Sequence, residues 1–203
     1  MSNPRNIGVS PHNPGRPAWL EEIIQPLYHR IQFAAGAIAA TRFFTNPAAV
    51  TPVDITPQLS ASNGQIPTPK LFVTQGIRVV VAEDGTLANR ITDLLIFLWN
   101  TSFQFFIGER TYLWAPTWLV PAGGVGAYQQ SEQGGLVGAT DRLVAQSGKG
   151  GYFDRFSLQR IPITIPATQL FYCEVAPDGA AAPTLTSALN VTVVLDGAFG
   201  REL

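Results

Sequence analysis

The sequence predicts an all-β fold, and its central stretch is the first observation that does so. Residues 102–121, SFQFFIGERTYLWAPTWLVP, contain two aromatic-rich runs separated by Gly108-Glu109. The pattern predicts a β-hairpin, because aromatic residues suit a half-buried sheet surface and a helix would not normally contain Gly108 and Pro116. Further apolar runs recur between turn signals, and helices do not alternate with strands as a parallel sheet would require.

The composition indicates that the chain works in an assembly. Only 13% of residues are charged, compared with about a quarter in ordinary soluble domains, while 46% are hydrophobic. A chain with so few charges exposes weakly polar surface as a monomer, and a partner commonly covers such surface. We therefore expect obligate homo-oligomers. The net charge of −1 provides no field for holding phosphates, so direct nucleic-acid binding is not expected.

Residues 1–26 are predicted to be an N-terminal arm followed by a short helix. Residues 1–17 contain four prolines and almost no large apolar side chain, which predicts an extended arm, with a frayed terminus as the alternative. Apolar residues then recur with helical spacing until Pro26 ends the pattern. This predicted helix supplies four candidate assembly anchors, Trp19, Leu20, Ile23 and Ile24.

The next part of the chain predicts extended segments around a long loop. Residues 27–36 fit a helix or a strand, whereas residues 37–45 favour extended structure because they lead into the turn signal Asn46-Pro47. Residues 46–69 contain five prolines, a composition that excludes a central strand and predicts a surface loop. Residues 72–81 then predict a strand with a bulge near Gly76.

A short helix over residues 87–98 is expected before the hairpin, and a long loop after it. Residues 122–151 contain nine glycines and few apolar side chains, which predicts the loop. The last third returns to strands at 156–165, 169–175 and 190–195. Prolines bracket the alternating isoleucines of RIPITIP, which favours an edge strand there, and turns are predicted at Asp178-Gly179 and Asp196-Gly197.

About eight antiparallel strands with long connections and one or two short helices fit a two-sheet jelly-roll β-sandwich. Residues 27–203 would form this single domain, with long loops at 46–69 and 122–151. No run approaches the length of apolar sequence that a membrane span needs, and no signal peptide is recognisable at the N-terminus. We therefore expect no transmembrane segment and synthesis in a cytoplasm.

Catalytic and metal-ligating patterns do not stand out. The two histidines, His12 and His29, both precede the predicted framework, so neither a multi-histidine metal site nor a histidine-based catalytic triad is expected. A single cysteine, Cys173, excludes an intrachain disulfide and is predicted to be a buried, inert thiol. We expect no enzymatic activity, no cofactor and no metal. A facing carboxylate pair for glycoside hydrolysis stays open, drawn from Glu83, Asp84, Asp93, Glu174 and Asp196.

The aromatic residues allow a second functional interpretation. Trp99, Tyr112, Trp114 and Trp118 could form a sugar-stacking platform, because an exposed aromatic face packs against the apolar face of a pyranose. Core packing is the interpretation that we prefer from the sequence. Tryptophans that face outward in the folded protein would reverse this order.

Four segments carry a resemblance to a known group of proteins. They are the arm and helix at 1–25, the FFTNP corner at 43–47, the hairpin at 102–121 and RIPITIPATQLFYCEV at 160–175. In architecture the chain resembles the single jelly-roll capsid proteins of icosahedral viruses, with bacteriophage virion proteins as the closest group. The resemblance implies a self-assembling subunit located in the virion, whose partners are copies of itself and other virion proteins.

The resemblance leaves the place in the shell open between a major capsid protein, a minor vertex protein and a cement protein. Capsid proteins that package nucleic acid often carry a basic arm, but residues 1–17 contain only Arg5 and Arg16. The chain therefore fits a shell or shell-decorating subunit. The alternative is a carbohydrate- or receptor-binding β-sandwich module, such as a phage host-recognition protein, with a glycan as its ligand.

Overall fold

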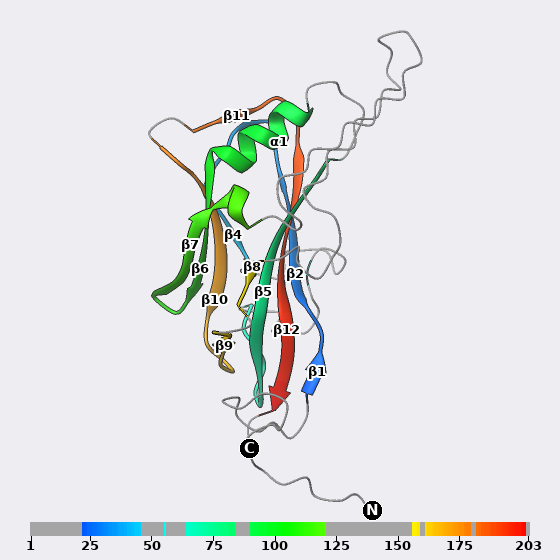
Figure 1. Ribbon diagram of the computed structural model, residues 1–203, viewed down its shortest axis with the longest axis vertical. Coiled ribbons are helices and arrows are strands. Elements are labelled where there is room, and N and C mark those ends of the chain that lie inside the picture. The colour runs from blue at the N-terminus through cyan, green and yellow to red at the C-terminus, as the bar shows by residue number, and fades with distance from the viewer. Residues whose placement is uncertain are drawn as a thin grey trace, which may run out of the picture.

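The computed structural model describes residues 22–45, 55, 64–83, 90–120, 156–158, 161–179 and 182–201. Within them the chain is mostly β, with antiparallel sheets and one α-helix (Figure 1). The predicted arm, Trp19, Leu20, the loop at 122–151 and most of the loop at 46–69 lie outside the described residues.

The first sheet is built on two long strands, β5 (Lys70–Glu83) and β12 (Leu189–Arg201), which pair antiparallel along their whole length. Two short strands lie end to end on the free side of each long strand. Those beside β12 are β1 (Glu22–Ile24) and β2 (Leu27–Phe33), and those beside β5 are β8 (Phe156–Ser157) and β9 (Ile163–Ile165).

The second sheet has the order β4-β10-β6-β7. Its strands are β4 (Thr41–Phe43), β6 (Thr101–Ile107), β7 (Arg110–Pro116) and β10 (Phe171–Pro177). A separate ribbon pairs β3 (Gly36–Ala37) with β11 (Thr184–Leu185). The helix α1 (Arg90–Trp99) lies at the same end of the molecule as β11 (Figure 1), and a 3-10 turn, η2 (Thr117–Leu119), follows β7.

One hydrophobic core lies between the two sheets. Alternate residues of each strand point into it, as expected for a sheet with one buried face. Val79 and Val193 enter from the first sheet, Phe105 and Cys173 enter from the second, and all four side chains are fully buried. Helix α1 closes one end, where Phe97 meets the Phe33 ring edge to face at 5.0 Å between ring centroids. The described part of the chain is therefore an all-β sandwich.

Several predictions from the sequence are confirmed. The hairpin is present as β6 and β7 with a turn at Gly108-Glu109. The prediction of extended structure at 37–45 is confirmed for residue 37 in β3 and residues 41–43 in β4, and residues 90–98 belong to α1. The strand at 72–81 forms the middle of β5, and the register between β5 and β12 shifts beside Gly76. β9 lies at the edge of its sheet in the described part, as the prolines of RIPITIP indicated.

Two predictions of local structure are wrong. Residues 22–24 of the predicted N-terminal helix form β1, because the β-branched Ile23 and Ile24 pair with residues 198–199 of β12. Asp196-Gly197 lies inside β12 and makes no turn; it faces a bulge in β5, where Gln75 is the extra residue between the partners of Asp196 and Gly197. A Cβ atom on Gly197 would lie 2.1 Å from the Val73 carbonyl oxygen, so this position opposite the bulge requires a residue without a side chain.

The corner after β4 is a tightly organised part of the core, and it involves His29. Sequence reasoning placed His29 before the framework, which is wrong, because it lies in β2 and is buried. Its Nδ1 atom accepts a hydrogen bond of 2.7 Å from the backbone N–H of Phe44, so that nitrogen carries no proton. Phe44 has a φ of 68°, and the hydrogen bond to His29 helps to hold this unfavourable conformation.

Candidate functional site

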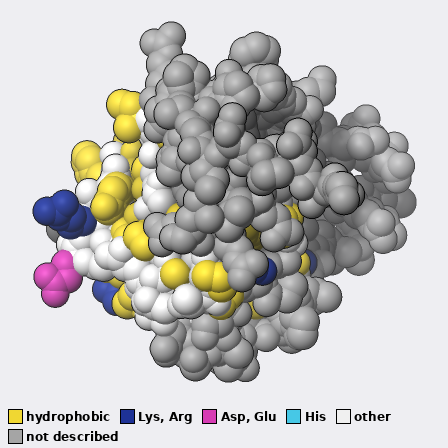
Figure 2. Space-filling model, turned by 90° about the horizontal axis from the view of Figure 1, so that it is seen from below, with side chains coloured by type: hydrophobic (Ala, Val, Ile, Leu, Met, Phe, Trp, Pro, Cys, Tyr) yellow, Lys and Arg dark blue, Asp and Glu magenta, His cyan; other side chains and the backbone are white. Residues whose placement is uncertain are grey.

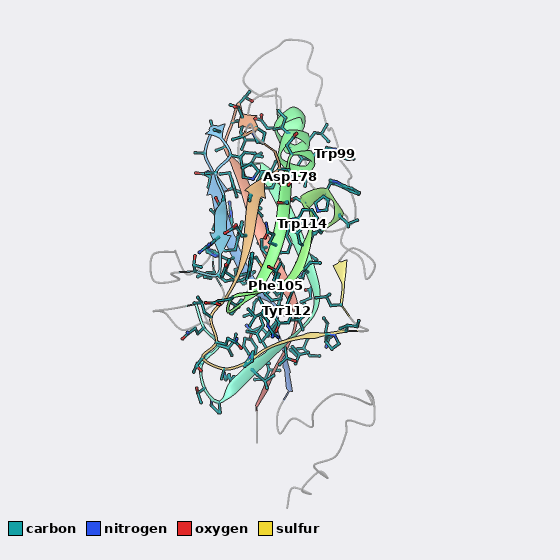
Figure 3. The ribbon with its side chains drawn as sticks, turned by 90° about the vertical axis from the view of Figure 1, so that its left-hand side faces the viewer. Trp99, Phe105, Tyr112, Trp114 and Asp178 are labelled. Carbon is teal, nitrogen blue, oxygen red and sulfur yellow. The ribbon has the colours of Figure 1, made fainter. Side chains whose placement is uncertain are left out.

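Three of the four candidate aromatics are exposed. Trp99, Tyr112 and Trp114 are 56%, 47% and 62% exposed, so core packing, the preferred interpretation from the sequence, is wrong for them. Trp118 is partly buried against the core and stacks on Trp99, with ring centroids 5.3 Å apart and planes inclined by 24°. Figure 3 shows Trp99, Trp114 and Tyr112 in succession, from the end of α1 along β7.

The outward position of Trp114 follows from the alternation of the hairpin. Ala115 is buried and Leu113 packs against the core, so Trp114 between them points away from the sandwich. Tyr112 lies where the register between β6 and β7 shifts, and its ring centroid is 6.5 Å from that of the buried Phe105. Trp99 is the last residue of α1.

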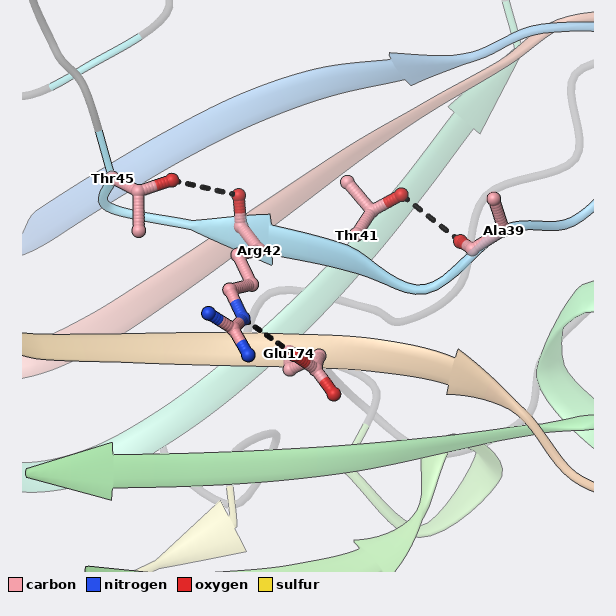
Figure 4. Close-up of polar contacts among 5 residues, drawn as sticks. All are labelled: Ala39, Thr41, Arg42, Thr45 and Glu174. Carbon is pink, nitrogen blue, oxygen red and sulfur yellow. Dashed lines mark hydrogen bonds and ion pairs between the residues drawn. The ribbon is translucent and has the colours of Figure 1, made fainter. Parts of the chain in front are cut away.

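A row of side chains crosses the outer face of the β4-β10-β6-β7 sheet. The strand registers align Arg42 with Glu174, Glu174 with Gln104, and Gln104 with Trp114. At one end of the row, Nε of Arg42 donates a hydrogen bond of 2.7 Å to Oε2 of Glu174 (Figure 4). The Arg42 side chain is 57% exposed and that of Glu174 is 19% exposed. The hydrogen bond to Glu174 raises the pKa of Arg42 above its ordinary value.

A second row on the same face consists of stacked aromatic rings. Tyr172 and Phe106 are register partners, and their ring centroids are 4.6 Å apart with planes inclined by 18°. The guanidinium carbon of Arg42 lies 4.5 Å from the centroid of the Tyr172 ring, within the range of a cation–π contact. We call the surface formed by both rows the outer aromatic face; its residues are Arg42, Gln104, Phe106, Trp114, Tyr172 and Glu174.

Sequence reasoning missed Phe106 and Tyr172 as surface residues. Both are half-buried, and each lies between two buried neighbours in its strand. These neighbours are Phe105 and Ile107 in β6, and Phe171 and Cys173 in β10. The period of two along FQFFI and FYCEV was therefore a signal that could have identified them. That signal gives the face of the sheet, while the register that brings the two rings together comes only from the pairing of β6 with β10.

The carboxylates proposed for glycoside hydrolysis are separately engaged where the structure describes their side chains. Glu174 pairs with Arg42, and Asp196 accepts two hydrogen bonds from Arg78 at 2.7 and 2.8 Å. Asp93 is buried, and its carboxylate accepts hydrogen bonds from the backbone and side chains of Thr186 and Ser187. Nothing in these contacts brings two of the three carboxylates together as a pair.

Cys173 is fully buried and is a free thiol. Burial raises the pKa of this thiol well above its ordinary value, as expected for an inert core residue. Within the described ranges, no group of three or more His, Cys, Asp and Glu side chains could hold a metal ion. His12 lies outside those ranges.

The helices in the described part of the chain include none that is both long and apolar enough to span a membrane. Comparisons of the chain with family models, with curated proteins and with solved structures found no match.

Proposed function

We propose that the sandwich is a jelly roll, and its strand pairing supports this. β1 and β2 lie end to end against β12, as do β8 and β9 against β5, so each pair occupies one strand position. With the β3-β11 ribbon set apart, eight positions follow in chain order. The first pairs with the last, the second with the seventh, the third with the sixth and the fourth with the fifth. This nested antiparallel pairing is what a rolled-up hairpin ribbon produces.

We propose that the protein is a structural subunit of a bacteriophage virion, where it assembles into the capsid shell with copies of itself and other virion proteins. The nested strand pairing is the observation that carries the proposal, because shell subunits are a major use of the jelly roll. Since a fold alone does not determine function, the surface provides separate support. Charged residues make up only 13% of the sequence, and the exposed large apolar side chains include Ile23, Ile24, Ile161 and Leu170.

Apolar side chains are also exposed on β1, which lies toward the end of the molecule opposite α1 (Figure 1). Figure 2 views the molecule from that end, and the described atoms visible beside the grey ones include hydrophobic side chains with a few charged ones among them. Two candidate anchors, Ile23 and Ile24, lie in β1, which pairs with β12 alone in the described part of the sheet. Ile24 is 85% exposed, so it is available to a neighbouring subunit.

The purified full-length protein is expected to form homo-oligomers, most simply with threefold or fivefold symmetry, because its apolar surface needs a partner. Light scattering and native mass spectrometry measure the oligomer. Ile24→Ser is expected to weaken association while changing the free energy of unfolding by less than about 0.5 kcal/mol, since the side chain is exposed. Ile24→Val, which keeps an apolar side chain, is the matched control. A wild-type monomer that persists at high concentration and does not assemble with virion partners would contradict the proposal.

Deletion of residues 1–17 is expected to impair particle formation while leaving the melting temperature of the β-sandwich nearly unchanged. Four prolines preorganise an extended chain, which loses less entropy on docking against a neighbour. Thermal unfolding and electron microscopy of particles compare the full-length and truncated proteins. Truncated subunits that assemble with full yield and particle stability would identify the arm as an ordinary frayed terminus.

A carbohydrate- or receptor-binding module is the second candidate function. The outward position of Trp99 and Trp114 favours it, because large aromatic side chains at the surface are suited to stacking on sugar rings. Measuring the mass in solution together with glycan binding separates the two candidates. An assembled particle without glycan binding supports the shell subunit, and a glycan-binding monomer supports the module.

A further inference from the structure

We propose that the outer aromatic face binds a neutral oligosaccharide, with Trp114 and the stacked pair of Tyr172 and Phe106 as stacking surfaces and with Arg42 and Glu174 as hydrogen-bonding groups. The inference rests on the second candidate function, the carbohydrate-binding module, which gives the class of ligand. It does not require shell assembly, because a sugar-binding site could serve either a monomer or a subunit of a shell.

The face is continuous because strand pairing brings its two rows together. Gln104 and Phe106 are two residues apart on β6, and Tyr172 and Glu174 are two residues apart on β10, so all four point to the same side of the sheet. Trp114 is opposite Gln104, which places it diagonally across from Phe106. The aromatic side chains therefore occupy neighbouring positions on the three strands β7, β6 and β10.

The aromatic part suits the apolar face of a sugar ring. A pyranose presents a layer of C–H groups on one face, and this layer packs on the flat, electron-rich surface of an aromatic ring. Trp114 is 62% exposed, so its indole is available to a ligand. The mutual stacking of Tyr172 and Phe106 fixes their orientation before any ligand arrives, which lowers the entropy lost on binding.

The polar part suits hydroxyl groups that both donate and accept hydrogen bonds. Arg42 supplies N–H donors, Glu174 supplies carboxylate acceptors, and Gln104 supplies both kinds. The 2.7 Å bond between Arg42 and Glu174 and the contact of Arg42 with Tyr172 hold the guanidinium in a defined position. A sugar hydroxyl beside this pair can make the hydrogen bonds that water makes to Arg42 and Glu174 in the free protein. Both charged groups therefore keep hydrogen-bond partners when the ligand is bound.

Charge complementarity selects a neutral ligand. Arg42 and Glu174 compensate each other, so an anionic sugar would meet the carboxylate and a cationic sugar would meet the guanidinium. A protein partner fits less well, because Glu is depleted at protein interfaces and burying the ion pair of Arg42 and Glu174 costs desolvation free energy. Four strands spaced by about 4.8 Å give the row from Arg42 to Trp114 a length of roughly 14 Å. The row is therefore long enough for a ligand of more than one sugar ring.

The test titrates the full-length protein with neutral oligosaccharides of glucose, mannose, galactose and N-acetylglucosamine, using isothermal titration calorimetry and tryptophan fluorescence. Wild-type protein is expected to bind at least one of them. Trp114→Ala and Tyr172→Ala are each expected to weaken binding by about tenfold or more, which is the effect of losing one aromatic contact. Trp114→Tyr should retain most of the affinity because it keeps a stacking surface. Leu119→Ala, an exposed apolar residue of η2, is the control that should bind as the wild type does.

Several results would overturn the inference. One is the absence of binding by the wild type to every neutral oligosaccharide. Another is loss of binding in Trp99→Ala with normal binding in the Trp114 and Tyr172 variants, which would place the sugar on the Trp99-Trp118 stack. Stronger binding of uronic-acid oligosaccharides than of neutral ones would contradict the charge argument. If Trp114→Ala dissociates an oligomer and the wild type binds no sugar, the face is an interface between copies of the chain.

The variants also separate this inference from the proposed shell function. Light scattering of Trp114→Ala and Tyr172→Ala reports assembly independently of sugar binding. Variants that assemble normally and lose sugar binding support both proposals. Sugar binding by a protein that never assembles supports the outer aromatic face and removes the shell subunit. Thermal unfolding of each variant establishes that it is folded, which is expected because the substituted side chains point outward.

Discussion

Gly64→Ala is expected to lower the free energy of unfolding by about 2–5 kcal/mol. Gly64 has a φ of +63°, and a Cβ atom at this position would lie 1.8 Å from the carbonyl oxygen of Phe44. The left-handed conformation costs a residue with a side chain about 1–2 kcal/mol, and relieving the overlap requires the backbone to move, at a further cost of about 1–3 kcal/mol. Together these penalties amount to a large fraction of the total stability of a domain, which is about 5–15 kcal/mol. Urea unfolding monitored by circular dichroism measures the loss.

Gly108→Ala is the matched control for this substitution. Gly108 has nearly the same φ, +60°, but a Cβ atom there would meet only the side-chain amide of Gln169 among the described residues, at 3.3 Å. Because that side chain can move aside, the control carries the conformational cost without a collision with the backbone. If Gly64→Ala and Gly108→Ala lose the same small amount of stability, the close approach of Gly64 to Phe44 does not hold the corner together.

Asp93→Asn is expected to lower the free energy of unfolding at neutral pH by about 2–4 kcal/mol, because it removes charge-assisted hydrogen bonds from a buried site. The carboxylate accepts four hydrogen bonds of 2.6–2.9 Å from Thr186 and Ser187, and these bonds tie the segment between β11 and β12 to α1. The Asn side chain replaces one carboxylate oxygen by an NH₂ group. The N–H and O–H groups of Thr186 and Ser187 that face this NH₂ group then have no acceptor. Chemical denaturation of both proteins gives the difference.

The stabilisation by Asp93 should also depend on pH. Burial alone would raise the pKa of Asp93, but the hydrogen bonds from Thr186 and Ser187 outweigh it, so the pKa lies below its ordinary value of 3.8. A lowered pKa means that the ionised group stabilises the fold fully above the ordinary value, and the stabilisation is lost as the pH falls through the folded-state pKa. Asp93→Asn should therefore flatten the decline of stability on the acid side.

Asp178→Asn is the control for this pH dependence. Asp178 is exposed, so its substitution should have little effect on the curve of stability against pH. An acid limb of the same steepness in Asp93→Asn and in the wild type would show that the buried carboxylate does not stabilise the fold in its ionised form.

The fold could be predicted where local sequence and tertiary environment agree. The hairpin of β6 and β7 has alternating aromatic residues and a turn that contains glycine. Both features lie within a few residues of one another in the sequence, so the sequence alone predicts the hairpin. Asp196-Gly197 has the composition of a turn, yet it lies inside β12, because pairing with β5 continues on both sides of the bulge. Similarly, Ile23 and Ile24 follow a helical spacing, and the pairing partner that makes them a strand lies far away in the sequence, in β12. Pairing over such distances overrides local spacing.

The candidate site could be predicted only as a set of residue types. The sequence identified Trp99 and Trp114 as stacking residues, but their exposure depends on Trp99 ending α1 and on which face of β7 turns toward the core. The contact of Arg42 with Glu174 joins residues 132 positions apart in the sequence. No local pattern contains such a pairing, because it results from β4 and β10 being neighbours.

The nested pairing of the strands also determines the order in which the sheets can form. The hairpin of β6 and β7 closes a short loop, so it can form early at a small entropic cost. β2 pairs with β12, which is the last strand of the chain. The first sheet can therefore form only by closing a loop that contains most of the domain. Folds dominated by such distant contacts acquire their structure over milliseconds to seconds. During synthesis, the edges of β2 and β5 that pair with β12 therefore stay unpaired until β12 has been made. Unpaired strand edges can bind other chains, so the risk of aggregation is greatest during this interval.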